Sequence, residues 1–363
     1  MPGMPGRVLI AMSGGVDSSV AAARLVADGY EVIGVTLHLW DTPDDGTVRG
    51  RCCAPEDVHD ARRVADVLGI PHYAFDRRRE FEREIVAPFV QSYLDGETPS
   101  PCVRCNRGVK MKELLHLADE LGAERVATGH YARIRDEDGV LGLYRARDAS
   151  KDQSYFLHML DREQLSRLCF PLGDREKQEV RSEAERLGLP GAGKGESQEL
   201  CFVPTGRYDE LVSARASDRI RPGAIVDAEG RVVGSHEGVH RFTLGQRRNL
   251  GVALGERAFV VDIDAPSSTV RLGSREALDS RLAELDELSL AADVRLPLRA
   301  GVAVRYRGAA HPAEIRPRPG GGAEVAFDAP VRAVVPGQFA VFYRGDRVLG
   351  GGRICSNTKL GSS

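Results

Sequence analysis

The stretch Ala11-Met12-Ser13-Gly14-Gly15-Val16-Asp17-Ser18-Ser19 lies between an apolar run at 8–10 and an alanine-rich run at 20–27. The first run is typical of a buried strand, and the second predicts a helix. A strand, a glycine turn and a helix N-terminus form an anion site, because backbone N–H groups and the helix dipole point towards the turn. Two adjacent glycines let a phosphate approach the backbone, and the serines add hydroxyl donors. The stretch therefore predicts a phosphate-binding loop.

This loop differs from two common phosphate loops. A Walker A loop needs a lysine followed by Ser or Thr, and the first lysine of this chain is Lys110. The glycine spacing of Rossmann dinucleotide sites is also missing. Asp17 stands where the phosphates would lie, so we expect it to hold Mg²⁺ against them, to cap the helix, or to do both. A plain capped turn is the alternative interpretation.

Composition places the chain among ordinary globular proteins. Its 363 residues predict two or three domains, with 42% hydrophobic and 28% charged residues. A net charge of −3 means that any nucleic-acid contact must come from a local basic patch. No apolar run approaches the ~20 residues of a membrane span, and the N-terminus has no signal-peptide pattern, so we expect a cytoplasmic protein without a membrane partner.

The order of segments predicts the architecture. Strand-like and helix-like runs alternate over residues 7–132, which predicts an α/β fold with a Rossmann-like parallel sheet. Ligands of such sheets lie beyond the carboxyl ends of the strands, so we expect the loop, Leu37 and Gly129 to converge on one nucleotide. Short apolar runs between turns after about 205 predict two small β-barrels. We expect a catalytic domain over 1–205 with a helical insertion from about 150, and barrels over 206–275 and 276–363.

Two stretches within this scheme have less regular patterns. Residues 276–290 are acidic and apolar, which predicts a linker with a short helix. Arg305-Tyr306-Arg307 is most simply a solvated strand face, although arginines can meet phosphates and a tyrosine can stack on a base.

Seven cysteines in a long chain, an odd number, disfavour a disulfide framework and favour thiol chemistry or metal binding where they cluster. Cys102-Val103-Arg104-Cys105 forms a C-x-x-C within 96–108, whose glycines and prolines predict a loop. A thioredoxin-like redox pair is one interpretation. A metal site is another, because Cys201 supplies a third thiolate, which suits a [4Fe–4S] cluster with an open iron. A nucleophilic thiol is the third, because two neighbouring arginines and a helix beginning near residue 108 would lower the pKa of Cys105.

Cys201 follows a glycine-rich stretch at 191–197, which predicts a mobile loop that could carry chemistry. A buried cysteine between apolar neighbours is the alternative.

The loop resembles that of the N-type ATP pyrophosphatases, and nearly the whole chain resembles the bacterial tRNA-specific 2-thiouridylases of the MnmA type. The pieces that carry the resemblance are residues 11–19, Thr98-Pro99-Ser100-Pro101 with Cys105-Asn106, residues 127–131, residues 151–157, Cys201-Phe202, residues 243–248, and Pro336-Gly337-Gln338.

The resemblance implies a reaction that uses ATP. ATP would adenylate O2 of the wobble uridine in tRNAs for Lys, Glu and Gln, and sulfur would then displace AMP. Cys201 would carry a persulfide from a cysteine desulfurase or a sulfur-relay protein. Either its terminal sulfur attacks C2, or Cys105 frees that sulfur by forming a disulfide with Cys201. ATP with Mg²⁺ would bind at Ala11, Met12, Ser13, Gly14, Gly15, Val16, Asp17, Ser18, Leu37 and Gly129.

The resemblance also implies a tRNA surface, including the helical insertion from about 150, and a target base that leaves its stack. The residues it points to are Ser100, Pro101, Cys102, His130, Lys151, Asp152, Gln153, Arg305, Tyr306 and Gln338. Some family members have Asp where this chain has Cys102, so Cys102 would serve as an auxiliary thiol or a cluster ligand. A different adenylating ligase, which would not need Cys201, and a non-catalytic nucleotide-gated RNA-binding or redox-sensing module are the competing hypotheses.

Overall fold

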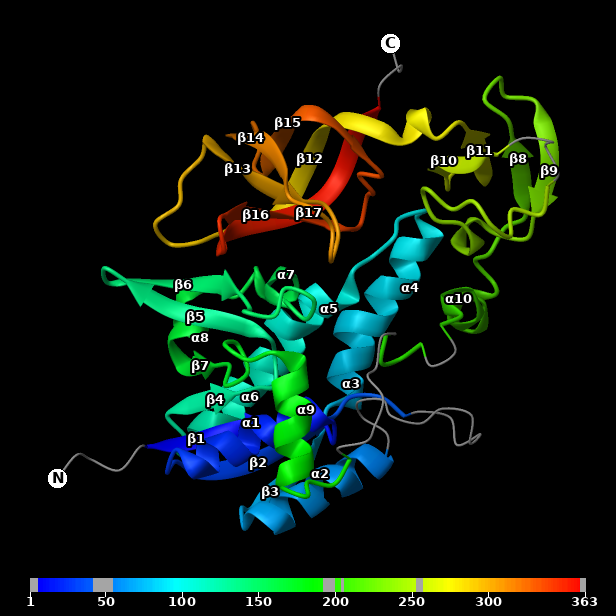
Figure 1. Ribbon diagram of the computed structural model, residues 1–363. Coiled ribbons are helices and arrows are strands. Elements are labelled where there is room, and N and C mark those ends of the chain that lie inside the picture. Colours follow the sequence, from blue (N-terminus) through cyan, green and yellow to red (C-terminus); the bar gives the residue numbers. More distant parts are fainter. Residues whose placement is uncertain (1–5, 42–54, 192–199, 204–205, 253–256, 360–363) are drawn as a thin grey trace.

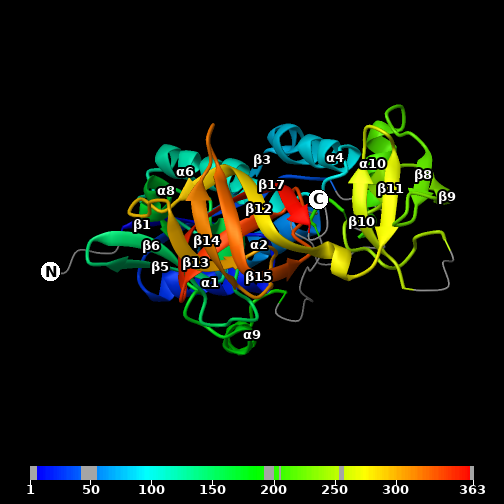
Figure 2. The ribbon, with the colours of Figure 1, turned by 90° about the horizontal axis from the view of Figure 1, so that it is seen from above.

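The computed structural model describes residues 6–41, 55–191, 200–203, 206–252 and 257–359. Within these ranges the chain builds three parts. A parallel sheet with its helices forms the lower part of Figure 1, a C-terminal barrel lies above it, and a small four-stranded sheet lies to one side. The top view in Figure 2 shows the barrel over the parallel-sheet part, with the four-stranded sheet beside α4 and α10.

In the described ranges, five strands form the parallel sheet in the order β3-β2-β1-β4-β7. These strands are β1 (Arg7–Ala11), β2 (Glu31–His38), β3 (His72–Asp76), β4 (Arg125–Ala127) and β7 (Leu168–Cys169). The short strand β7 interrupts a stretch whose polar sequence predicts helix throughout, and it pairs with β4.

Helices cover both faces of this sheet. Val8 and Ile10 of β1 belong to one hydrophobic cluster, whereas Leu9 between them belongs to another. This alternation explains why the strand is apolar at successive positions. The first cluster contains α1 (Val16–Ala27), α2 (Pro55–Leu68) and α9 (Lys177–Arg186). The second contains α3 (Arg78–Phe81), the π-helical turn η1 (Glu82–Val86), α4 (Ala87–Leu94) and α6 (Met111–Glu120).

A β-hairpin that the sequence prediction missed links the parallel-sheet part to the barrel. Strands β5 (Ala132–Glu137) and β6 (Val140–Arg145) are joined by Asp138 and Gly139, both at positive φ. An Asp-Gly turn between alternating residues is a recognised hairpin signal. Tyr144 of β6 pairs with Arg347 of the C-terminal barrel, so the hairpin extends the barrel sheet. The helices α7 (Ser154–Leu157) and α8 (Arg162–Arg167) follow it.

The last two parts are built from mostly antiparallel strands and short helices, with one parallel pair, β8 and β11. The helix α10 (Tyr208–Ala216) precedes a sheet of β8 (Gly223–Val226), β9 (Val232–His236), β10 (Phe259–Asp264) and β11 (Thr269–Gly273), with the short helix η3 (Val239–Arg241). The barrel contains η4 (Glu276–Leu278), β12 (Asp279–Leu290), β13 (Leu298–Ala303), β14 (His311–Pro317), β15 (Ala323–Arg332), β16 (Phe339–Arg344) and β17 (Arg347–Lys359). Pairing of β12 with β17 closes it.

Three local predictions are wrong. Residues 101–108 of the expected loop are helical, because Pro101 starts the first turn and buried contacts extend the helix. They belong to α5 (Pro101–Arg104) and to the π-helical turn η2 (Cys105–Lys110). Residues 279–290 of the expected linker are the strand β12, which pairing on both sides stabilises. Arg305-Tyr306-Arg307, which the sequence predicts as a solvated strand face, lies in a turn after β13. Arg307 adopts a positive φ there.

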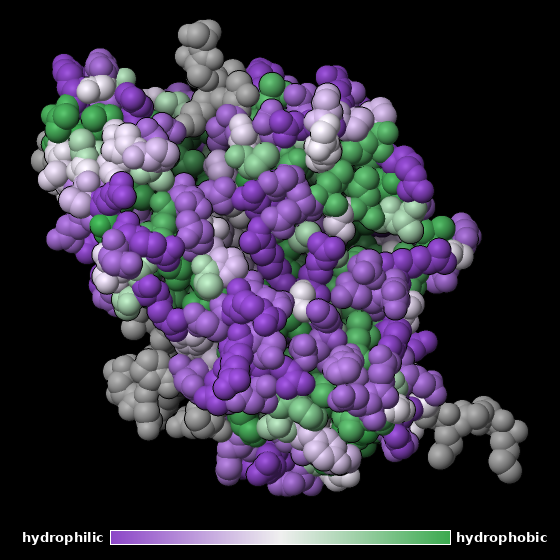
Figure 3. Space-filling view, turned by 180° about the vertical axis from the view of Figure 1, so that it is seen from behind, coloured by the Kyte–Doolittle hydropathy of each residue, from purple (hydrophilic) through white to green (hydrophobic). Residues whose placement is uncertain are grey.

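The surface mixes polar and apolar side chains. Figure 3 shows several separate hydrophobic areas among hydrophilic residues on the back face. Across the described ranges, no helix combines the length and the apolar character needed to cross a membrane.

Candidate active site

The loop at residues 11–19, here called the pyrophosphate loop, is shaped by its own hydroxyl groups. Ser18 Oγ donates to the carbonyl of Gly15 at 3.0 Å and accepts from the backbone N–H of Ser13 at 3.2 Å. The helix α1 is capped by Gly15 without a side-chain bond, so the expectation that Asp17 caps it is wrong: Asp17 lies one step inside the first turn. The loop therefore keeps its glycine backbone open at the start of the helix.

Steric contacts explain why glycine stands at position 14 of this loop and at position 129, which packs against it. Gly14 has a φ of +73°, and a Cβ there would lie 2.9 Å from the Cα of Asp57, at the start of α2. A Cβ on Gly129 would lie 2.8 Å from the backbone nitrogen of Ser18. The ends of β1 and β4 thus meet, as the strand order predicts. Leu37 is buried near the end of β2, within the second hydrophobic cluster.

A lysine reaches the loop from a distant helix. Lys177 Nζ donates to both carboxylate oxygens of Asp17, at 2.7 and 2.8 Å, and Tyr131 Oη donates to one of them at 2.8 Å. The backbone N–H of Lys177 in turn donates to Asp148. The sequence has no lysine close to Asp17, but the fold brings Lys177 to it from 160 positions further along the chain, so the interpretation of Asp17 as a carboxylate without a nearby lysine is wrong. No local sequence motif predicts such a contact.

Cys102 and Cys105 lie on a helix, which we call the cysteine helix (residues 101–110). Cys105 is only 5% exposed and opens the π-helical turn η2, a distortion that is frequent at functional sites. Asn106 Nδ2 donates to the carbonyl of Phe156 at 3.3 Å, which ties this turn to α7. Cys105 therefore belongs to the buried core and not to an exposed loop.

Cys201 is held by its neighbour. Phe202 is 2% exposed and packs edge-on against Trp40, Phe81 and Phe89. Cys201 is half-buried and packs against the hydrophobic cluster that contains Cys105. The glycine-rich stretch before it lies outside the described residues, so the predicted mobility of that stretch stays a prediction.

Two expectations for these thiols gain no support. No disulfide joins any two of the described cysteines, at positions 102, 105, 169, 201 and 355. In the part of the chain that the structure describes, no three His, Cys, Asp or Glu side chains are grouped so as to hold a metal ion. Cys102, Cys105 and Cys201 thus do not form the ligand set that an iron–sulfur cluster would need.

Several of the residues predicted to meet tRNA have internal partners. Asp152 is 7% exposed and accepts from the Ser154 hydroxyl at 2.9 Å, with Arg145 at 3.3 Å. The Gln153 side chain accepts from the N–H of Tyr131 at 2.9 Å. Burial lowers the pKa of His130 to about 3, with a further contribution from Lys110, so this imidazole is neutral at physiological pH. Lys151 lies in the turn next to them.

Five of the ten residues predicted to meet tRNA line one of two pockets. The first lies between the hairpin, α7 and the barrel, and its walls include Asp152, Arg305 and Tyr306, with Arg145 and Arg307 adding positive charge. The second lies between α4, the cysteine helix and the barrel, and its walls include Ser100, Pro101, Arg104 and Arg353. Gln338 lies beside the second pocket, where its amide donates to the carbonyl of Thr98 at 2.8 Å.

Comparisons with known proteins agree with this arrangement. The protein-family model described as tRNA methyl transferase HUP domain matches residues 6–205, which is more than half of the chain. The models described as tRNA methyl transferase PRC-barrel domain and Aminomethyltransferase beta-barrel domain match residues 214–274 and 283–354. These matches confirm the predicted α/β fold followed by two barrels.

Curated relatives match over nearly the whole length. The tRNA-specific 2-thiouridylase MnmA of Sorangium cellulosum is 63% identical over 358 residues, covering 97% of this chain and 93% of the relative. The MnmA of Moorella thermoacetica is 49% identical, covering 97% of this chain and 100% of the relative. The MnmA of Paramagnetospirillum magneticum is 47% identical, covering 96% and 95%. The resemblance expected from the motifs is thus confirmed, and the chain belongs to the MnmA family of tRNA-specific 2-thiouridylases.

Proposed function

We propose that this chain converts the wobble uridine of tRNAs for Lys, Glu and Gln into 2-thiouridine at the expense of ATP. The observation that supports this most is that the pyrophosphate loop lies on the same α/β domain as Cys105 and Cys201, which share one hydrophobic cluster. The loop suits the activation step and the thiols suit the sulfur step. We infer that the reaction takes place in the cytoplasm, where unmodified tRNA is available.

In the first step, the uracil O2 attacks the α-phosphorus of ATP and pyrophosphate leaves. The backbone of Ser13, Gly14 and Gly15 would bind the phosphates, because these residues form the turn at the N-terminus of α1. Asp17 is the carboxylate that would hold Mg²⁺, in exchange for part of its contacts with Lys177 and Tyr131, because Mg²⁺ is usually bound by one or two carboxylates and phosphate oxygens. Bound Mg²⁺ would neutralise phosphate charge, and Lys177 would supply a second positive charge beside the loop. Ala11, Met12, Val16, Ser18 and Leu37 would line the nucleotide site.

In the second step, sulfur replaces the adenylated oxygen. Cys201 would carry a persulfide, loaded by a cysteine desulfurase or a sulfur-relay protein. The Cys105 thiolate attacks the Cys201 sulfur, the S–S bond breaks, and the released sulfur bonds to C2 as AMP leaves with O2. The products are 2-thiouridine, AMP and a Cys105–Cys201 disulfide, which a dithiol reductant must reopen before the next turnover. Cys102 would be an auxiliary thiol.

The first of these pockets would guide the tRNA. Arg305 and Tyr306 suit a phosphate and a stacked base, respectively. We propose the other tRNA contacts at Ser100, Pro101, Cys102, His130, Lys151, Asp152, Gln153 and Gln338. We also propose the domain limits 1–205, 206–275 and 276–363, with a helical tRNA-binding insertion from about 150.

The test is an assay with ATP, Mg²⁺, a persulfide donor and unmodified tRNA for Glu, in which 2-thiouridine and pyrophosphate are measured separately. We expect Cys105→Ser and Cys201→Ser to abolish 2-thiouridine while pyrophosphate release persists. Cys355→Ser is the matched control, because this thiol lies in the barrel and bonds to the carbonyl of Glu284. No 2-thiouridine from the wild type, with pyrophosphate release that does not depend on Cys201, would instead favour a different adenylating ligase. ATP binding without any pyrophosphate release would favour a non-catalytic module.

A further inference from the structure

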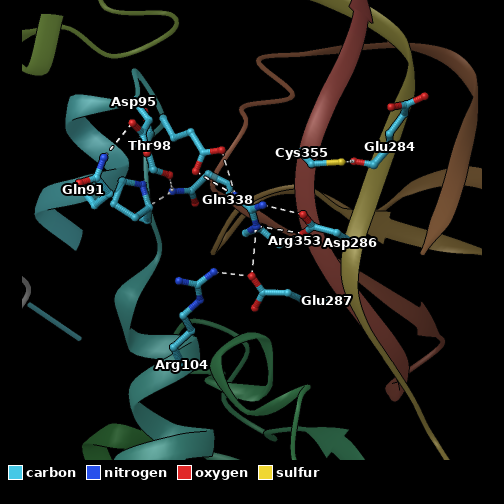
Figure 4. Close-up of polar contacts among 12 residues, drawn as sticks. Gln91, Asp95, Thr98, Arg104, Glu284, Asp286, Glu287, Gln338, Arg353 and Cys355 are labelled. Carbon is cyan, nitrogen blue, oxygen red and sulfur yellow. Dashed lines mark hydrogen bonds and ion pairs between the residues drawn. The ribbon is translucent and has the colours of Figure 1, made fainter. Parts of the chain in front are cut away.

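The cysteine helix and the segment before it meet the barrel through a cluster of charged side chains centred on Arg353 of β17 (Figure 4). Arg353 Nη1 lies 2.9 Å from both carboxylate oxygens of Glu97. Arg353 Nε and Nη2 bond to the two oxygens of Asp286 at 2.9 and 2.5 Å, and Nε lies 3.2 Å from Glu287. Glu287 also pairs with Arg104 of the cysteine helix. Arg353 thus joins two barrel carboxylates to the segment that leads into the helix.

Backbone contacts hold the same segment. The N–H of Thr98 donates to the carbonyl of Pro336 at 3.0 Å, and the Gln338 amide donates back to Thr98. Gly337 between them has a φ of +90°, and a Cβ there would lie 2.9 Å from the Thr98 carbonyl carbon. Hydrogen bonds at 2.8 and 2.9 Å tie this turn to Ile354, the residue after Arg353. The turn and Arg353 therefore act on residues 97–99 as one unit.

The charge balance makes Arg353 the critical member of this cluster. Three carboxylates, from Glu97, Asp286 and Glu287, face two guanidinium groups, from Arg104 and Arg353. The Arg353 side chain is only 20% exposed, so solvent screens these charges incompletely. Its removal would leave three neighbouring carboxylates with one cation, which favours separation of Glu97 from the barrel.

We propose that Arg353 is a positioning residue for the sulfur step: by binding Glu97 against Asp286 and Glu287, it fixes the segment whose next residues carry Cys102 and Cys105. The proposal rests on the proposed function of Cys105. Position matters for thiol exchange because the attacking sulfur must approach the S–S bond closely and in line. The pyrophosphate loop makes none of these contacts, so its chemistry is expected to continue without Arg353.

The test compares Arg353→Met, Arg353→Lys and Glu97→Gln in the full-length protein. The matched control is Arg332→Met, because Arg332 forms a two-point pair with Asp279 in the same barrel, at 2.9 and 3.2 Å. Measurements are thiolation kcat and KM for tRNA, tRNA-dependent pyrophosphate release, and the pH profile of iodoacetamide alkylation at Cys102 and Cys105, read by peptide mass spectrometry.

We expect Arg353→Met to lower thiolation kcat on the order of 100-fold, with pyrophosphate release changed less than about threefold. Alkylation of Cys102 and Cys105 should accelerate about tenfold and shift in pH dependence. Arg353→Lys should retain part of the thiolation kcat. Glu97→Gln should lower this kcat as Arg353→Met does, although the pairs of Arg353 with Asp286 and Glu287 remain. Arg332→Met should have the kcat of the wild type.

Three outcomes would overturn the proposal. A higher KM for tRNA at unchanged kcat would make Arg353 a tRNA contact. Equal losses of thiolation and pyrophosphate release in Arg353→Met would mean a general effect on folding. The same conclusion would follow if Arg332→Met lowered thiolation as much as Arg353→Met does. Unchanged alkylation in both Arg353→Met and Glu97→Gln would show that the cysteine helix does not depend on the cluster. Failure of the proposed function is separate, because it would appear as full thiolation by Cys105→Ser with Arg353 intact.

Discussion

The pyrophosphate loop is held mainly by its own strand, turn and helix, whereas the segment that leads into the cysteine helix, residues 97–99, is bound to the C-terminal barrel. The loop uses Ser18 hydroxyl bonds to Ser13 and Gly15, within six residues. In residues 97–99, Thr98 bonds to Gln338 and Glu97 bonds to Arg353, over separations of 240 and 256 positions. Activation chemistry thus belongs to a local motif, whereas the thiols depend on contact with a domain proposed to bind tRNA.

The largest expected effect tests the local character of the loop. Gly14→Ala should lower tRNA-dependent pyrophosphate release on the order of 100-fold, because φ is +73° and the new Cβ would press on Asp57. Gly15→Ala is the matched control: its φ is −89°, and the nearest atom to its Cβ is Ser13 Oγ at 3.5 Å. ATP titration and pyrophosphate assays measure both. Similar losses in the two variants would refute the steric explanation.

The next effect tests a distant contribution to the loop, the ion pair between Lys177 and Asp17. Lys177→Met should slow pyrophosphate release by roughly 30- to 100-fold, because a positive charge beside the phosphates is lost and Asp17 loses its ion pair. Lys177→Arg should retain part of the rate. The exposed Lys112 on α6 provides the control Lys112→Met. A normal rate for Lys177→Met would restrict Lys177 to a structural ion pair.

The third effect concerns the thiol side and should leave the loop untouched. Phe202→Ala removes a ring that packs on Trp40, Phe81 and Phe89, which should lower the free energy of unfolding by about 3 kcal/mol. We expect thiolation to slow on the order of tenfold through misplacement of Cys201, with pyrophosphate release preserved. Phe202→Leu should be milder. Thermal denaturation measures stability, and separate assays measure 2-thiouridine and pyrophosphate. An equal loss of both products would contradict the idea that the sulfur step can be impaired without the pyrophosphate loop.

The smallest effect at neutral pH comes from His158, which lies between α7 and the barrel. Burial lowers its pKa to about 4, and its ring packs against Phe339 and Gly351. Between pH 6.5 and 4 the unfolded chain binds a proton here and the folded chain does not. The free energy of unfolding should therefore fall with falling pH, by up to roughly 3 kcal/mol. Denaturant titrations between pH 4 and 8 measure this, and the pH dependence should flatten in His158→Gln. An equal slope in both proteins would exclude this histidine as the cause.

Sequence reasoning succeeded where the signal was local. The apolar run of β1, the glycine turn and the helix start predicted the loop and the parallel sheet, because each of these patterns is complete within a few residues of the chain. The Asp138-Gly139 hairpin carried an equally local signal that was missed. The cysteine helix was mistaken for a loop, because prolines and glycine suggested flexibility while burial against α7 and the barrel decided otherwise.

The sequence by itself determined the α/β class, the pyrophosphate loop, the two barrels and, through resemblance, the family. Tertiary structure decided that Lys177 pairs with Asp17 and that Arg353 binds the approach to Cys102 and Cys105. The physical reason is the range of the contacts. Backbone geometry and hydrophobic periodicity act over a few residues and leave a pattern in the sequence. A single ion pair between positions 160 or 256 residues apart leaves no such pattern, because any surface lysine or arginine has the same local sequence signal.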